Sequence, residues 1–113
     1  LEAVNSTTTK RIVVSIQNHD TLDFLRPDDV IEISCDLSRD GLKPVTPVKV
    51  PTAQKNMIAC VKEYERLAVA AILQQDKSLA VRALMAHPLI GSYSLAKTLV
   101  EAYLDDEQFA AWR

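Results

Sequence analysis

Residues 57–73 read MIACVKEYERLAVAAIL, and this stretch decides the class of fold. Its apolar side chains recur every three or four residues, which is the spacing of an amphipathic helix. The pattern predicts a helix over residues 52–75, with Thr52 as a plausible N-cap. Residues 67–73 are apolar all round, so we expect this part of the helix to be covered on every side.

Two shorter helices are expected after the long one. Asp76 can cap a helix over residues 77–87, and Pro88 ends it because the residue before a proline disfavours helical backbone. A third helix is expected over residues 94–105. Phe109 and Trp112 then close the chain as apolar anchors.

Two strands are expected before the long helix. Strict alternation of apolar and other residues predicts a half-buried strand over residues 11–17, with Ile12, Val14 and Ile16 on one face. The same alternation predicts a second strand over residues 30–37. Polar turn residues separate the strands, and the stretch Arg39, Asp40, Gly41 closes the second one. Three prolines, at positions 44, 47 and 51, then predict an extended connector.

These elements predict an α+β fold of two or more antiparallel-type strands followed by a three-helix part. The size fits a single domain over residues 1–113. Its parts are a flexible terminus at 1–10, a strand-rich part at 11–51 and a helical part at 52–113. Because the chain opens at Leu1 rather than methionine, we expect it to be a fragment of a longer protein.

Composition narrows the possible partners and the compartment. A formal net charge of −2 with scattered basic residues argues against nucleic acid and anionic membranes, which require clustered Lys and Arg. No apolar run approaches the roughly 18 residues of a transmembrane helix, and no signal peptide is evident. We therefore expect a cytoplasmic protein in which Cys35 and Cys60 are reduced, buried thiols.

A zinc site is not expected, although His19, His87, Cys35 and Cys60 are the residue types that could form one. Structural zinc sites pair their ligands two to five residues apart, and here no two of the four lie closer than 16 residues. Both cysteines fall within apolar patterns, so packing explains them without a metal. The prediction for metal ligands is none.

Catalytic and cofactor-binding residues are also predicted to be none. Ser34 and His87 have nothing that fixes them together as nucleophile and base, and Tyr64 is expected in a core or an interface. Only two glycines occur, which excludes a glycine-rich phosphate loop. The acidic residues that could pair as acid and base are expected in turns, caps and solvated helix faces instead: Glu63 with Glu65, Asp28 with Asp29, and Asp105 with Asp106.

Several stretches, read in order, resemble a known family. They are IVVSIQN at 12–18, LRPDDVIEISC at 25–35, GLKP at 41–44, VKEYERLAVAA at 61–71 and ALMAHPL at 83–89. Together they are similar to the C-terminal region of glycoside hydrolase family 4, the NAD-dependent glycosidases, and most of all to its 6-phospho-β-glucosidases. The sequence departs from the family at three positions: Asp20 replaces a common glycine, Arg26 interrupts a Leu-Pro pair, and Ser34 replaces a proline.

The resemblance implies a function for a parent enzyme rather than for this chain. Family members cleave glycosides by oxidation and elimination, not by the paired-carboxylate route of most glycosidases. The parent would be a 6-phospho-β-glucosidase of carbohydrate metabolism that cleaves phosphorylated disaccharides with NAD and a divalent metal such as manganese. The family's nucleotide motif, metal ligands and catalytic tyrosine belong to the part before this segment.

The resemblance also implies a supporting role for the chain itself. Its partners would be the N-terminal nucleotide-binding part of the same enzyme and further copies in a homo-oligomer, and the isolated fragment would be inactive. Two points stay open from the sequence. The parent could act on α- or β-linked substrates, and the chain could instead be an autonomous interaction or dimerisation module without enzymatic activity.

Overall fold

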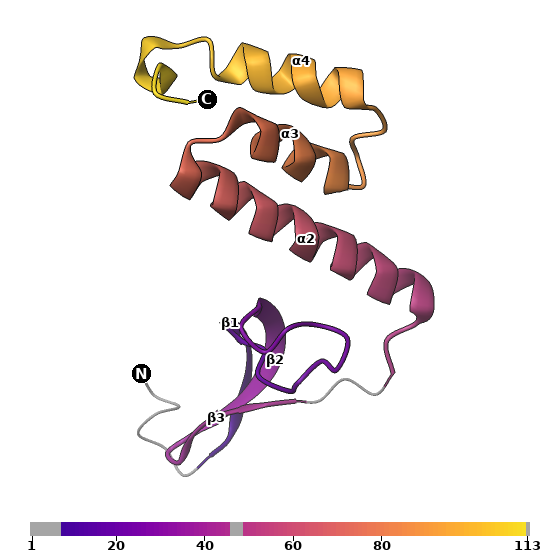
Figure 1. Cartoon of the computed structure of the whole chain (residues 1–113). Helices are drawn as coiled ribbons and strands as arrows, with labels where there is room; N and C mark the ends of the chain where they lie inside the picture. Colours follow the sequence, from indigo (N-terminus) through magenta and orange to yellow (C-terminus); the bar gives the residue numbers. More distant parts are fainter. Residues whose placement is uncertain (1–7, 46–48, 113) are drawn as a thin grey trace. The chain divides into compact units, whose positions relative to one another are not determined.

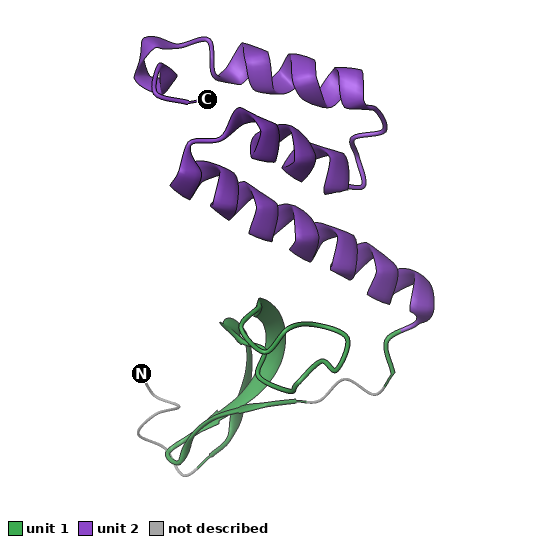
Figure 2. Cartoon of the chain, viewed as in Figure 1, with its two compact units in different colours: residues 1–50 green, residues 51–113 purple. Residues whose placement is uncertain are grey.

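The chain forms an α+β structure of three antiparallel strands followed by three helices, which confirms the predicted class. The computed structural model describes residues 8–45 and 49–112. These divide into two compact units, residues 1–50 with the strands and residues 51–113 with the helices (Figure 2). The expectation that both units belong to a single domain stays a prediction. Most of the expected flexible terminus, and Pro47 of the expected connector, lie outside the described residues.

The sheet of the first unit follows the predicted alternation. Strand β1 (Lys10–Gln17) pairs with the central strand β2 (Val30–Ser38), and β2 pairs with β3 (Gly41–Pro44) (Figure 1). Ile12 lies opposite Cys35 and Ile16 opposite Ile31 in the register, so apolar side chains meet across the strands on one face. Ile31 and Cys35 are buried there and form the core of this unit.

Strand β3 begins at Gly41, in the predicted turn, and ends at Pro44, the first proline of the predicted connector. A two-residue turn, Arg39 and Asp40, joins it to β2, and Ser38 pairs directly with Gly41. The φ of Gly41 is 115°, a backbone conformation that side chains with a Cβ rarely adopt. Pro44 ends the strand. The proline is tolerated because β3 is an edge strand, so its missing N–H does not interrupt the hydrogen bonds of a central strand.

The helices of the second unit agree closely with the predicted ranges. They are α2 (Thr52–Gln74), α3 (Lys77–Ala86) and α4 (Tyr93–Tyr103), and a short 3₁₀ turn, η1 (Glu107–Phe109), follows them. Among the described residues, no helix has the length and hydropathy needed to cross a membrane.

One of the two predicted caps is confirmed and the other is wrong. The Asp76 carboxylate accepts hydrogen bonds from the backbone N–H groups of Ser78 (2.7 Å) and Leu79 (3.0 Å), which caps α3 as expected. Thr52 does not cap α2. It is the first helical residue, and the N-cap position belongs to Pro51, whose extended backbone (φ −59°, ψ 148°) precedes the helix and which has no side-chain donor or acceptor.

A tight reversal after α2 brings α3 back alongside it. Gln75 adopts a left-handed conformation (φ 52°), and the N–H of Asp76 donates to the carbonyl oxygen of Ala71 (3.0 Å). Pro88 follows the end of α3, as predicted, and Ser92 caps α4 through a bond from the N–H of Leu95 (3.2 Å).

The three helices pack side by side, with α3 between α2 and α4 (Figure 1). The buried positions are three alanines and one valine: Ala71 on α2, Ala83 on α3, and Ala96 and Val100 on α4. Small side chains let neighbouring helices approach closely. Residues 67–73 are not covered on every side within this chain, because a single row of helices covers Ala71 and leaves others exposed: Val69, Ile72 and Leu73. Whether a longer chain covers them stays a prediction.

Candidate functional site

The loop between β1 and β2 is built around the side chain of Asn18, which is completely buried. Its Nδ2 donates to the carbonyl oxygens of Leu22 (3.0 Å) and Arg26 (3.1 Å), and its Oδ1 accepts from the N–H of Leu22 (2.8 Å). The Asp29 carboxylate, also buried, accepts from the N–H of Arg26 (2.9 Å). The turn role predicted for the polar residues between the two strands is confirmed for Asn18 and Asp29, and these bonds hold the loop in one conformation.

The four residues weighed for zinc lie on different elements. His19 is exposed on the loop, in a left-handed conformation with φ 49°, and Cys35 is buried in β2. Cys60 is exposed on α2, so the expectation of a second buried thiol is wrong. Within residues 8–45 and 49–112, no group of three or more His, Cys, Asp or Glu side chains is placed to hold a metal ion.

The exposure of Cys60 follows from the lengths of the helices. At about 1.5 Å per residue, the 10 residues of α3 span less than half the length of the 23-residue α2. Since α3 turns back from the C-terminal end of α2, the N-terminal half of α2 extends beyond it. Helical periodicity correctly predicted which residues share a stripe, but it carries no information on how far the neighbouring helix reaches.

Tyr64 and His87 form a structural pair. Their rings meet edge to face with centroids 4.8 Å apart, a favourable aromatic geometry. The Nδ1 of His87 also accepts a hydrogen bond from the N–H of Leu89 (3.2 Å), which holds the ring at the end of α3. The imidazole thus joins α2 to the segment after α3, and the core or interface role expected for Tyr64 agrees with this contact.

The acidic residues weighed for catalysis have structural partners in most cases. Glu63 pairs with Arg66 (3.0 Å) and Glu65 pairs with Lys62, both along the exposed face of α2. Asp106 accepts from the N–H of Gln108 (3.0 Å) and caps η1. These contacts are the helix-face and cap roles that the sequence indicated.

An ion pair joins β1 and β2 near one end of the sheet. Arg11 and Asp36 face each other in the register, with Nε to Oδ1 at 2.8 Å and Nη2 to Oδ2 at 3.1 Å. The hydrogen bonds from Arg11 lower the pKa of the Asp36 carboxyl, and the same bonds raise the pKa of Arg11. Both side chains are in contact with solvent, so we expect the ion pair to contribute little to the free energy of unfolding.

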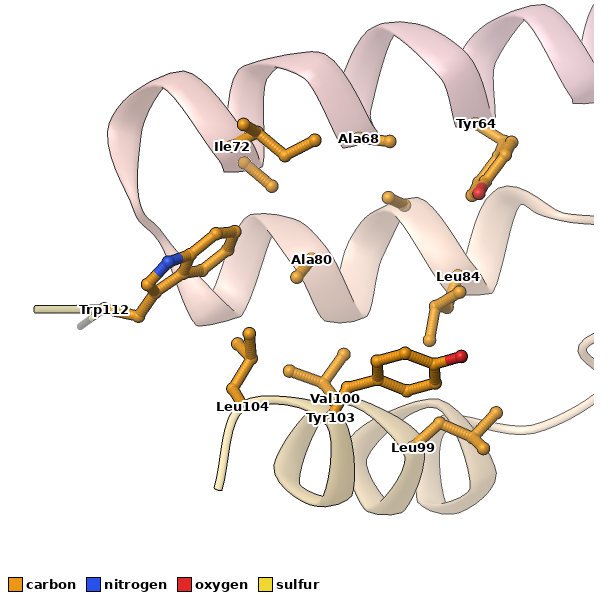
Figure 3. Close-up of a pocket in the computed structure, with 12 residues that line it drawn as sticks. Tyr64, Ala68, Ile72, Ala80, Leu84, Leu99, Val100, Tyr103, Leu104 and Trp112 are labelled. Atoms are coloured by element: carbon orange, nitrogen blue, oxygen red, sulfur yellow. The ribbon is translucent and has the colours of Figure 1, made fainter. Parts of the chain in front are cut away.

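An apolar groove lies among the three helices. Its volume is about 500 Å³, and α2, α3, α4 and the C-terminal segment supply its walls (Figure 3). None of its 12 lining residues is charged: nine are aliphatic, and three are aromatic, namely Tyr64, Tyr103 and Trp112. Such a surface offers no acid, base or nucleophile beyond two tyrosine hydroxyls, and it is suited to binding another apolar surface.

The sequence signalled this groove only in part. The all-round apolar run 67–73 indicated a surface that needs a cover, and Trp112 was expected as an anchor. The hollow itself depends on how α4 and the C-terminal segment return alongside α2 and α3. Helical periodicity does not contain that information.

The structure is an α+β fold with an apolar groove in its helical unit, and comparison with known proteins places the chain in a family. Residues 1–90 match the model of the family 4 glycosyl hydrolase C-terminal domain. The chain therefore belongs to the family 4 glycosyl hydrolases, as their C-terminal domain.

Individual relatives agree with this placement. The chain is 33% identical, over 93 residues and 82% of its length, to the 6-phospho-beta-glucosidase BglT of Thermotoga maritima. It spans only about a fifth of the length of the curated relatives it matches, 22% in the case of BglT.

Two solved structures share the fold. A Thermotoga maritima 6-phospho-beta glucosidase with manganese, NAD+ and glucose-6-phosphate superposes with a TM-score of 0.78 at 30% identity, over 94% of this chain and 26% of that one. A 6-phospho-alpha-glucosidase from gut microorganisms, with NAD and glucose-6-phosphate, gives a TM-score of 0.81 at 23% identity, over 99% of this chain and 25% of that one.

Proposed function

We propose that the chain is the C-terminal support domain of a 6-phospho-β-glucosidase, a hydrolase that cleaves phosphorylated β-glucosides in the cytoplasm with NAD and manganese. The observation that carries the proposal is the 33% identity to a 6-phospho-beta-glucosidase over 82% of the chain. The phospho-α-glucosidases that the chain matches are 19–23% identical, a level that supports the fold and not the substrate. The β assignment therefore rests on the more similar sequence.

Neither NAD nor manganese fits the side chains that the structure describes in residues 8–45 and 49–112. The chain has two glycines, too few for a nucleotide-binding glycine motif, and its described His, Cys, Asp and Glu residues form no cluster that could hold a metal. We therefore assign both groups to the rest of the enzyme, in an N-terminal nucleotide-binding part. The role of this domain is to support that part, as one C-terminal domain, and to take part in subunit contacts.

The alternative is an autonomous interaction or dimerisation module, and a form of it that needs no partner to cover its helices fits the helical unit less well. A module complete in itself would bury its long helix within its own 113 residues. Ile72 and Leu73 are instead 63% and 79% exposed on α2. Two exposed branched side chains beside an apolar groove favour a domain whose cover is supplied by other protein.

The substrate assignment is tested on the longer enzyme chain that carries this domain. With NAD and manganese supplied, we expect turnover of a chromogenic 6-phospho-β-glucoside and at least about tenfold less of the α-anomer, a difference of about 1.4 kcal/mol in transition-state binding. Omission of either NAD or manganese serves as the control and should abolish turnover. Preference for the α-anomer would contradict the β assignment, and inactivity on both would contradict the glucosidase assignment.

A further inference from the structure

We propose that His87 acts as a pH-sensitive switch: its neutral imidazole holds the turn between α3 and α4, and the protonated imidazole releases that turn. The turn covers residues 88–92. The switch concerns the helical unit alone, residues 51–113. It goes beyond the proposed function, because it requires neither substrate nor cofactor.

Several contacts meet at His87, the C-cap residue of α3. Its backbone N–H donates to the carbonyl oxygen of Leu84 (3.1 Å), and its own carbonyl oxygen accepts from the N–H of Ile90 (3.0 Å). Its Nδ1 accepts from the N–H of Leu89 (3.2 Å), and its ring meets the ring of Tyr64 edge to face. The imidazole therefore joins the turn both to the end of α3 and to α2.

The bond at Nδ1 defines the protonation state of the ring. An imidazole nitrogen accepts a hydrogen bond only when it carries no proton, so the ring that accepts from Leu89 is neutral and has its proton on Nε2. An imidazolium ring has a proton on each nitrogen and no acceptor left. Proton uptake therefore breaks the bond and places two N–H donors against each other. Histidine side chains commonly take up a proton between about pH 5 and pH 8.

The end of α3 gives the charged ring a second favourable position. The last carbonyl groups of a helix carry partial negative charge and attract an imidazolium. His87 follows directly after the last residue of α3. The neutral ring is thus held by the N–H of Leu89, whereas the charged ring is repelled by that N–H and attracted by the helix end. The two protonation states favour different ring positions.

The surrounding groups do not replace the lost bond. The turn itself contains no titratable side chain, and within residues 8–45 and 49–112 no carboxylate forms an ion pair with His87. From α2 the ring meets Tyr64. The half-buried Lys62 and Arg66 pair with glutamates of α2 itself. The other charged side chains of α3, α4 and the middle of α2 lie on exposed helix faces: Glu63, Glu65, Lys77, Arg82, Lys97 and Glu101.

The released turn leads directly into α4. Ser92, the last residue of the turn, caps α4 by accepting from the N–H of Leu95 (3.2 Å). A turn that loses its contact to His87 therefore loosens the connection between α3 and α4, while both helices keep their own caps.

The test is NMR spectroscopy of this 113-residue chain at about pH 8 and about pH 5. Imidazole nitrogen shifts should identify the Nε2–H form of His87 at the higher pH. Exchange of the Leu89 amide with water, corrected for its intrinsic pH dependence, should become about three- to tenfold less protected at the lower pH.

Two variants separate the proton from the shape of the side chain. His87→Asn keeps an acceptor, because an asparagine side-chain oxygen can bond the N–H two residues on, and it does not titrate. We expect the Leu89 amide to stay protected at both pH values. His87→Phe keeps an aromatic ring beside Tyr64 but has no acceptor, so the amide should be unprotected at both. The matched control is His19→Asn, in the sheet unit, which should leave the response of Leu89 unchanged.

Three results would overturn the proposal: a neutral His87 with its proton on Nδ1, a Leu89 amide whose protection is the same at both pH values, or a pH response that survives in His87→Asn. None of these measurements involves substrate. They therefore succeed or fail independently of the glucosidase assay, which tests the proposed function.

Discussion

The two units of the chain are held together by different chemistry. In the sheet unit, the buried side chain of Asn18 forms hydrogen bonds through both its Nδ2 and its Oδ1, all to the backbone of its own loop. In the helical unit, small alanines pack the helices together while Ile72, Leu73 and Tyr103 stay exposed. The comparison teaches that the sheet unit depends on polar contacts within its own loop, whereas the helical unit depends on close packing of small side chains and exposes more of its large apolar side chains.

The largest expected effect comes from breaking the polar centre of the sheet unit. Asn18→Ala removes the donor and acceptor that hold the backbone of Leu22 and Arg26, and it leaves buried carbonyl and N–H groups unpaired. We expect a loss of about 2–4 kcal/mol in the free energy of unfolding. Urea unfolding measures the loss, and hydrogen exchange should show it first in the loop of residues 18–29.

The matched control is Asn56→Ala, at an exposed asparagine on α2. We expect a change below about 0.5 kcal/mol for this surface substitution. If the two variants unfolded at the same urea concentration, the loop would not be organised by Asn18 and the contrast between the units would be lost.

A somewhat smaller effect is expected from overpacking the helical unit. Ala96 is completely buried on α4, and Ala96→Leu forces the helices apart at a cost of about 1–3 kcal/mol in stability. Ala102→Leu, on an exposed position of the same helix, is the control and should be nearly neutral. Both substitutions change an alanine to leucine on the same helix, so their effects on helix propensity are similar. A difference between their melting temperatures therefore reports the close packing at Ala96. An unchanged melting temperature for Ala96→Leu would mean that Ala96 is not closely packed between the helices.

The smallest effect concerns the solvated ion pair of the sheet. Because Arg11 lowers the pKa of Asp36, the pair contributes its stability fully above the pKa of the unfolded carboxyl, about 3.9, and loses it as the pH falls through the lower folded value. An NMR titration of the Asp36 carboxyl should show its pKa rise in Arg11→Gln. It should show no change in Lys10→Gln, and a pKa insensitive to Arg11 would contradict the pairing.

Local patterns predicted most of the fold. The alternation around Ile12 and Ile31 gave the two long strands, and the cap at Asp76 was recognised because both its donors lie within three residues. The prediction of Thr52 as the N-cap was wrong because the helix already begins at Thr52. Pro51, in an extended conformation, takes the N-cap position.

Features set by tertiary packing were not predictable in the same way. Whether Cys60 is buried depends on the reach of α3, and the groove depends on the return of Trp112 toward α2 and α3. The family was predictable from ordered motifs despite these gaps. The expected absence of a catalytic set stays a prediction, to be tested by assay.

The central claim is that this chain supports an active site supplied by other protein. The most direct test is turnover of a chromogenic 6-phospho-β-glucoside by the purified 113-residue chain with NAD and manganese, with the longer enzyme as the positive control. The account predicts no turnover above buffer by the chain and clear turnover by the longer enzyme. Turnover by the chain alone would contradict it.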